Sequence, residues 1–168
     1  MQLRHKLGSI ACGLALAVGL GIAFAGPAAA KNNTWVCVNN DHVGLECAVS
    51  FPRHLSPVVI NDGIGGVPGG SLWDAPTSGT GQIRWAGSIK PGYCMEIHKD
   101  NKIVLDSCLG RASEKWSVAI GSNKLGLTYF YQSVYNPKLC LTAPSKGQLT
   151  VAKCNFKHLN QAWILMSP

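Results

Sequence analysis

The sequence predicts an all-β domain, and three observations carry this prediction. Beyond residue 30, no stretch of about ten residues or more has the apolar spacing of an amphipathic helix. Apolar residues fall instead in short alternating runs, such as 95–97, 103–105 and 149–151, separated by Gly, Asn, Ser, Lys and Pro. The run 129–135 is strand-like and rich in aromatic residues. With 168 residues, of which 46% are hydrophobic, the chain suits one core and excludes the disordered class.

The first thirty residues predict an export signal. A basic start at residues 4–6 precedes an uncharged stretch, 7–25, and three alanines at 28–30. This order is typical of a cleavable secretory signal. A membrane anchor is the alternative, because the uncharged stretch nearly spans a bilayer, but its many alanines and glycines make it weakly apolar. We expect residues 1–30 to be removed, leaving 31–168 as one exported, mildly basic domain with no membrane span.

Six of the seven cysteines lie beyond residue 30, and an even number in an exported chain indicates disulfides. The last four form two couples, each with thirteen residues between its members, and the first two are left as a third couple. Each disulfide would stabilise the fold by about 2–3 kcal/mol. Zinc is the alternative, but it requires close cysteine pairs that this sequence lacks. The predicted disulfides are Cys37–Cys47, Cys94–Cys108 and Cys140–Cys154.

An internal repeat follows. Cysteine, cysteine and tryptophan recur in the same order over the last part of the chain, and corresponding cysteines lie 46 residues apart. Agreement of such rare residue types by chance is improbable. The repeat predicts one copy over 92–137 and another over 138–168, each ending near a tryptophan, Trp116 or Trp163.

Residues 31–91 are expected to hold a third, diverged copy, because they contain two further cysteines and three further tryptophans. Its register stays open, since Cys37 and Cys47 are too close to match the other couples. The glycine-rich segment 61–70 is interpreted as an inserted surface loop. A phosphate cradle is the alternative, but neither a P-loop lysine nor a helix follows it.

The motifs of the last two copies resemble those of the ricin-B-type β-trefoil lectin domain. Each repeat of that family begins near Cys-Leu-Asp, closes a disulfide to a second cysteine and ends in Gln-x-Trp. The corresponding segments are Cys94-Met95-Glu96 with Glu114-Lys115-Trp116, and Cys140-Leu141-Thr142 with Gln161-Ala162-Trp163. The resemblance covers 92–168 directly and 31–91 by extension. It implies a β-trefoil of three pseudo-repeats stapled by disulfides within the repeats, with a shared core that includes Trp116, Gln161 and Trp163.

The resemblance also implies sugar pockets. In the family, the Asp of Cys-Leu-Asp accepts hydrogen bonds from sugar hydroxyls, an aromatic ring stacks on the sugar, and an Asn precedes Gln-x-Trp. Neither copy keeps the full set: Thr142 replaces the Asp in the third repeat, and Ser113 replaces the Asn in the second. We expect carbohydrate, a glycan or cell-wall polymer, to bind through degenerate pockets. Their candidate residues are Thr142, Phe156, His158 and Asn160 in the third repeat, and Glu96 and Arg111 in the second.

The sequence argues against an enzyme. A small basic exported protein suits a ribonuclease with a Glu base and a His acid, but no spacing ties His54 or His98 to Glu46 or Glu96. No Gly-x-Ser-x-Gly elbow occurs, and a pair of glycosidase carboxylates is unsupported because every acid lies in the first two thirds. We expect no catalytic residue, no cofactor and no metal.

The lysines from Lys124 to Lys157 run without an acid among them. This cationic stretch suits anionic glycans or an acidic protein partner, although an ordinary solvated surface is the plainer interpretation. Its diffuse charge argues against nucleic acid. The competing function is a secreted adaptor or structural subunit, for example in a toxin complex, that has lost its sugar pockets. Trp73, in a loop-like context, is its predicted exposed anchor.

Overall fold

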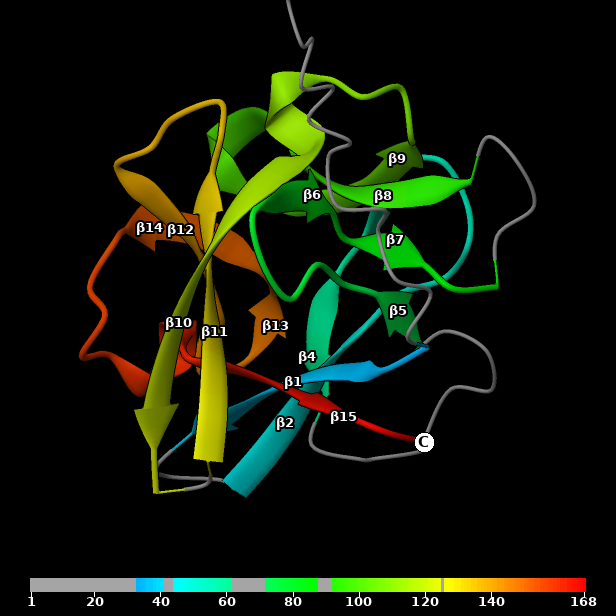
Figure 1. Ribbon diagram of the computed structural model, residues 1–168. Coiled ribbons are helices and arrows are strands. Elements are labelled where there is room, and N and C mark those ends of the chain that lie inside the picture. Colours follow the sequence, from blue (N-terminus) through cyan, green and yellow to red (C-terminus); the bar gives the residue numbers. More distant parts are fainter. Residues whose placement is uncertain (1–32, 41–43, 62–71, 88–91, 125) are drawn as a thin grey trace, which may run out of the picture.

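The computed structural model describes residues 33–40, 44–61, 72–87, 92–124 and 126–168 (Figure 1). The predicted signal peptide and nearly all of the glycine-rich segment lie outside these residues. Within them, strands dominate and the only helices are 3-10 helices of three residues each, which confirms the all-β prediction. None of the helices in these ranges is long and apolar enough to cross a membrane.

The strands are short, apart from the two that form one long hairpin, as the brief alternating runs predict. They are β1 (Trp35–Asn40), β2 (Gly44–Val49), β3 (Ser56–Pro57), β4 (Val59–Asn61), β5 (Trp73–Asp74), β6 (Thr80–Gln82), β7 (Arg84–Trp85), β8 (Tyr93–Ile97), β9 (Ile103–Ser107), β10 (Lys115–Asn123), β11 (Gly126–Ser133), β12 (Leu139–Thr142), β13 (Gly147–Gln148), β14 (Thr150–Lys153) and β15 (Trp163–Met166). The 3-10 helices are η1 (Lys99–Asn101), η2 (Ala112–Glu114) and η3 (Leu159–Gln161).

Three tryptophans, Trp73, Trp116 and Trp163, are completely buried and mark three equivalent repeats. Trp163 Nε1 donates a hydrogen bond to the carbonyl of Leu141, the residue after Cys140. Trp73 Nε1 donates in the same way to the carbonyl of Ala48, the residue after Cys47. The strand registers agree, because Cys47, Cys94 and Cys140 lie opposite Asn61, Asp106 and Ala152 in three antiparallel pairs. Cys47 is therefore the first-repeat counterpart of Cys94 and Cys140.

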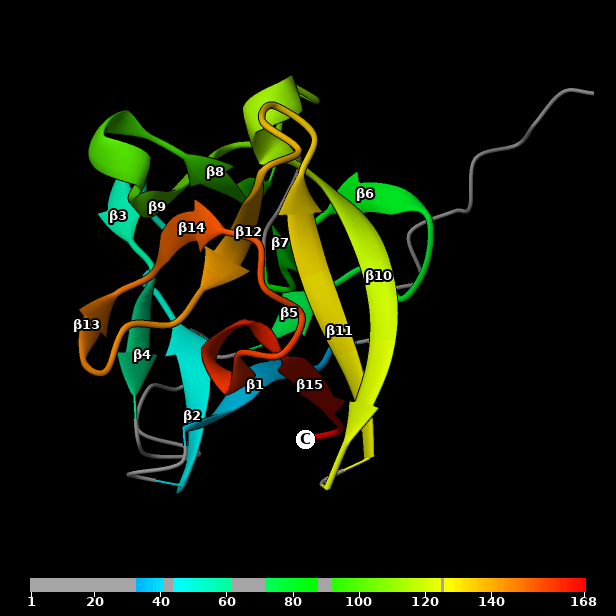
Figure 2. The same ribbon diagram turned by 90° about the vertical axis from the view of Figure 1, so that its left-hand side faces the viewer.

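The first and last strands close the fold. β1 pairs with β15 in the register Val38↔Trp163, and also with β2. β15 also pairs with β11. β11 in turn forms a long hairpin with β10, which runs down one side of the molecule (Figures 1 and 2). With its three tryptophan-anchored repeats, the architecture is a β-trefoil.

The cysteines pair as their spacing predicts: Cys37–Cys47, Cys94–Cys108 and Cys140–Cys154. The second and third disulfides span sequence separations of 14 residues within one hairpin each. The first differs because Cys37 and Cys47 face each other directly across β1 and β2. This difference explains why the spacing of the first couple obscures the register of the first repeat.

The structure corrects the expectation that Trp73 is an exposed anchor. Its side chain is completely buried, and Ala75 after it is also buried. The short strand β5 holds Trp73 opposite Trp85, and the indole fills the core position that Trp163 fills in the third repeat. Burial of so large an aromatic surface stabilises the core and leaves no indole face for a partner.

Candidate binding site

Arg111 is the centre of a charged network in the second repeat. It lies beside η2 and reaches three carboxylates from three different elements. Its Nη2 donates to Glu96 Oε2 of β8 at 2.8 Å and to Asp106 Oδ2 of β9 at 2.9 Å. Its Nε donates to Glu114 Oε1 of η2 at 2.6 Å. All three carboxylates are buried, whereas the arginine side chain is 42% exposed, so the guanidinium covers the acids at the surface.

The remaining oxygens of these carboxylates are also engaged. Ser113 Oγ donates to Glu96 Oε1 at 2.8 Å. His54 Nδ1 lies 2.8 Å from Asp106 Oδ1, which also accepts the backbone N–H of Ser107. Gln82 Nε2 and the backbone N–H of Gly110 both donate to Glu114 Oε2. Each carboxylate oxygen of Glu96, Asp106 and Glu114 therefore already has a hydrogen-bond partner within the protein.

The environment shifts the pKa values of the two carboxyl groups on β8 and β9 in opposite directions. Burial raises the pKa of Glu96 above its usual value, against the hydrogen bond from Ser113. Burial acts in the same direction on Asp106. There, the hydrogen bonds from the Ser107 N–H, Arg111 and His54 outweigh burial, and the pKa of Asp106 is lowered to about 2. Asp106 is thus the firmly ionised partner of Arg111.

This geometry bears on the two candidates predicted in the second repeat. Glu96 occupies the position of the sugar-binding Asp, and Arg111 is the predicted platform. The structure brings them together, but as partners of each other, with both oxygens of Glu96 occupied. Asp106 is absent from the sequence-based candidates, and His54 is named there only as a histidine that no spacing ties to an acid. His54 lies 52 residues from Asp106 in sequence, and no motif links them.

The pair of His54 and Asp106 resembles a general base, because a carboxylate orients the imidazole. Its remaining requirement is a hydroxyl or water that the imidazole activates. The hydroxyl of this network, that of Ser113, donates to Glu96 and not to His54. Among the described residues, His54 and Arg111 both contact Asp106, through its two different oxygens.

In the third repeat the polar candidates are likewise joined to each other. Thr142 is buried, and its Oγ1 donates to the carbonyl of Cys140 at 2.8 Å and accepts from Gln161 Nε2 at 2.9 Å. Gln161 Oε1 accepts the backbone N–H of Asn155. Gln161 thus occupies the position that Glu114 occupies in the second repeat, where Glu114 accepts the backbone N–H of Gly110.

The other third-repeat candidates lie nearer the surface. Phe156 and His158 are exposed, and Asn160 is half-buried with its backbone carbonyl accepting from Ala143 N. Phe156 packs edge-on against Phe130 of β11, with ring centroids 5.1 Å apart. The structure therefore joins Thr142 to Gln161 and joins Phe156 to the β10–β11 hairpin.

A hollow of about 330 Å³ lies beside this hairpin. Sequence reasoning found Phe156 but missed the rest of this site, because the hollow depends on the pairing of β10 with β11. The hollow is lined by Ala119, Ile120, Gly121, Ser122, Phe130 and Phe156.

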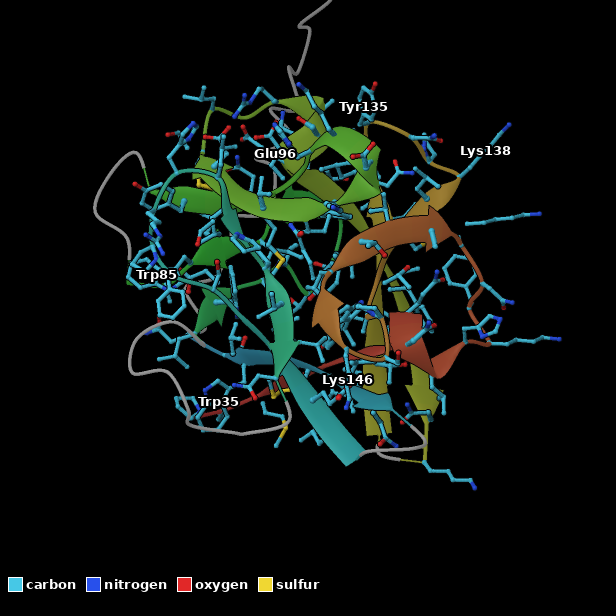
Figure 3. The ribbon with its side chains drawn as sticks, turned by 180° about the vertical axis from the view of Figure 1, so that it is seen from behind. Trp35, Trp85, Glu96, Tyr135, Lys138 and Lys146 are labelled. Carbon is cyan, nitrogen blue, oxygen red and sulfur yellow. A yellow bond between two sulfur atoms is a disulfide. The ribbon has the colours of Figure 1, made fainter. Side chains whose placement is uncertain are left out.

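Acidic and basic side chains are distributed unequally between interior and surface. Four of the six acidic residues that the structure describes are buried, whereas Lys138, Lys153, Lys157 and further lysines are exposed. In Figure 3, Lys138 extends away from the ribbon, whereas Glu96 belongs to the buried network. The surface is consequently more cationic than the composition indicates.

No family model matches the chain, and no curated protein matches its sequence. Several solved structures are similar. A mosquitocidal holotoxin has a TM-score of 0.63 and 16% identity over 82% of this chain and 17% of its own. The Haemophilus ducreyi cytolethal distending toxin has a TM-score of 0.57 and 15% identity over 83% of this chain and 86% of its own.

A third similar structure is the Polyporus squamosus lectin bound to the epitope Neu5Acα2-6Galβ1-4GlcNAc. Its TM-score is 0.56, with 14% identity over 80% of this chain and 49% of its own. The chain thus spans under a fifth of the holotoxin and about half of the lectin. Identities at this level show the fold alone. The chain therefore shares the β-trefoil fold with parts of a lectin and of two toxins.

Proposed function

We propose that this chain is a secreted, non-catalytic adaptor that binds a partner protein in an extracellular complex. One observation carries the proposal. The polar groups at the ricin-type pocket positions of the second and third repeats, Glu96 and Thr142, are bonded to other groups of the same repeat. A surface that has lost its sugar acceptors but keeps exposed apolar residues suits a protein partner.

The energetics favour the internal bonds over a sugar. Hydrogen bonds to charged groups contribute about 1.5–3 kcal/mol each, against about 0.5–1.5 kcal/mol for neutral ones. A sugar hydroxyl that displaced Arg111 from Glu96 would replace an ion pair by a hydrogen bond from a neutral donor. It would also leave buried carboxylates without their counter-ion. Glu96 is therefore a poor sugar acceptor while Arg111 is present.

The three disulfides support an extracellular place of action, because disulfides persist in oxidising compartments. The basic and apolar order of the first thirty residues supports export in the same way.

The test is co-purification of the tagged, oxidised protein from the secretion of its own cells. We expect a protein partner in defined stoichiometry, retained when simple sugars are added in excess. A reduced and alkylated sample, which lacks the disulfides, is the matched control and should retain nothing. Recovery of the chain alone from the native secretion would contradict the proposal.

Carbohydrate recognition in the third repeat is the second candidate. It is favoured by the exposure of Phe156 and His158 and by half-buried Asn160, which lies close to them in sequence. Aromatic faces and a side-chain amide are the groups that a sugar pocket needs. A glycan and cell-wall-polymer array tests it, with Asn160→Ala as the variant and Ser145→Ala, exposed in the same repeat, as the control. A glycan signal lost only in Asn160→Ala supports this candidate, and a blank array removes it.

A further inference from the structure

We infer that the hollow beside the β10–β11 hairpin is the docking site for an apolar side chain of a partner protein whose surrounding surface is acidic. The inference rests on the proposed adaptor function. It adds where the partner binds and what chemistry its surface carries.

The size of the hollow suits one anchoring side chain. Its volume of about 330 Å³ lies at the small end of the roughly 300–1,000 Å³ typical of ligand pockets. Two small residues of β10, Ala119 and Gly121, leave the space open. At Gly121 a Cβ would lie 2.9 Å from Phe130 Cε2, so the bare backbone is what lets that ring lie across the strand. Phe156, edge-on to Phe130, supplies the second aromatic boundary.

Large apolar side chains are exposed on the hairpin and at Phe156 beside it. Ile120 is 58% exposed, Leu127 is 54% exposed and Phe156 is 54% exposed. The pairing of Ser122 with Leu127 places Leu127 on the same face of the hairpin as Ile120, whereas the pairing of Ala119 with Phe130 places Phe130 on the opposite face. Exposed apolar residues that gather on one element mark an interaction site, whereas single scattered ones do not. The hairpin therefore offers an anchor pocket walled by Phe130 and Phe156, and its opposite face carries the exposed side chains of Ile120 and Leu127.

The charge around the hollow favours a partner protein with an acidic surface. The hollow is built entirely from residues after Glu114, and that part of the chain contains no acid. Lys124 lies just beyond the end of β10, and Lys157 directly follows Phe156; both are exposed. A second copy of this chain would bring like charges together, which costs binding energy. A partner with Asp and Glu around its apolar anchor gains electrostatic complementarity instead.

The test uses a random peptide library displayed on phage and panned against the immobilised, oxidised protein. We expect enriched peptides to carry a large apolar residue flanked by Asp or Glu. Synthetic copies should bind the double variant Phe156→Ser/Ile120→Ser about tenfold more weakly, a loss of about 1.4 kcal/mol. They should also lose affinity for Lys124→Glu/Lys157→Glu.

Matched controls come from another part of the molecule. Phe51 is 56% exposed and Leu109 is 66% exposed, and neither lines the hollow. The loop that contains Phe51 leads into β3, on the side of the molecule away from β10 (Figure 2). The variant Phe51→Ser/Leu109→Ser removes as much exposed apolar surface and should keep wild-type peptide affinity. Near-ultraviolet circular dichroism checks that every variant is folded.

Each other outcome overturns the inference. Peptides that bind Phe156→Ser/Ile120→Ser as tightly as wild type would place the site elsewhere and leave the adaptor function standing. Enriched peptides without acids, insensitive to Lys124→Glu/Lys157→Glu, would refute the acidic partner. An unproductive library, or binding to phosphatidylserine vesicles in place of peptides, would also refute it. Co-purification from the native secretion then decides the adaptor function separately.

Discussion

At the scale of single residues, Arg111 determines the character of the second repeat. The family resemblance implies a sugar-binding acid at Glu96 and a core tryptophan at Trp116; in the structure Trp116 is completely buried, and Glu96 is bonded to Arg111 and Ser113. What the sequence does not reveal is that Arg111 bonds to Glu96, Asp106 and Glu114 together. That arrangement depends on β8, β9 and η2 converging in space, which no local motif encodes.

Replacing Arg111 by alanine should destabilise the fold by about 2–4 kcal/mol. Removing one partner of a buried ion pair costs about 3–5 kcal/mol, and the partial exposure of the arginine reduces this cost. The loss should shrink in a Glu114→Gln background, because Gln161 fills the equivalent third-repeat position without an arginine. Urea denaturation of the four proteins of this double-mutant cycle measures the coupling. Unchanged stability in Arg111→Ala would contradict the account of the network.

Asp106 should make stability depend on pH in the acid range. Its folded pKa of about 2 lies below the usual unfolded value of about 3.9, so its contribution is present above pH 4 and lost as the pH falls toward 2. That contribution is about 2–3 kcal/mol. Asp106→Asn should be less stable than wild type at pH 6, and the difference should narrow between pH 4 and 2. A difference that stays constant over this range in denaturation experiments would exclude the assigned titration.

At the scale of elements, the β10–β11 hairpin is the feature that combines structure with a candidate site. Its aromatic strand is predictable from the run 129–135, and β11 covers that run up to Ser133. The hollow is not predictable, because it arises where small residues of β10 meet Phe130 of β11 and Phe156 from another loop. Side-chain size on one strand acquires meaning only through its cross-strand neighbours.

Substituting Gly121 by alanine should cost about 1–3 kcal/mol, the range for forcing an extra group into a packed site. The new Cβ would lie 2.9 Å from the Phe130 ring and 3.3 Å from Thr128 Oγ1, so the ring must shift. Ser122→Ala, on the same strand but exposed, is the control and should be neutral. Thermal denaturation of both variants gives the comparison, and equal melting temperatures would show that Phe130 does not depend on Gly121.

At the scale of the whole molecule, repeats and cysteines predict the fold, but not the register of its first third. Cys94 and Cys140 each pair with a cysteine 14 residues later, whereas Cys47 pairs backwards with Cys37 on the preceding strand. An alignment by cysteine order therefore places Cys37, and not Cys47, at the position of Cys94 and Cys140. The hydrogen bond from Trp73 to Ala48 resolves the register, and it also explains why Trp73 is buried.

The surface charge is also a property of the whole folded molecule. Folding buries most of the described carboxylates and leaves most of the described lysines exposed, so the described part of the surface is cationic. A count of charges along the sequence underestimates this asymmetry, because it assigns equal weight to Glu114 in the core and Lys157 at the surface. Long-range attraction of an acidic partner follows from the surface charge, and it weakens as salt rises.

The most direct test of the central claim is the size of the tagged protein in the undisturbed secretion of its own cells. Size-exclusion chromatography with light scattering gives this size in the presence and absence of excess simple sugars. An adaptor elutes in a complex heavier than the chain alone, and sugars do not release it. Elution as a free chain, together with a glycan signal that depends on Asn160, would contradict the claim and establish a lectin.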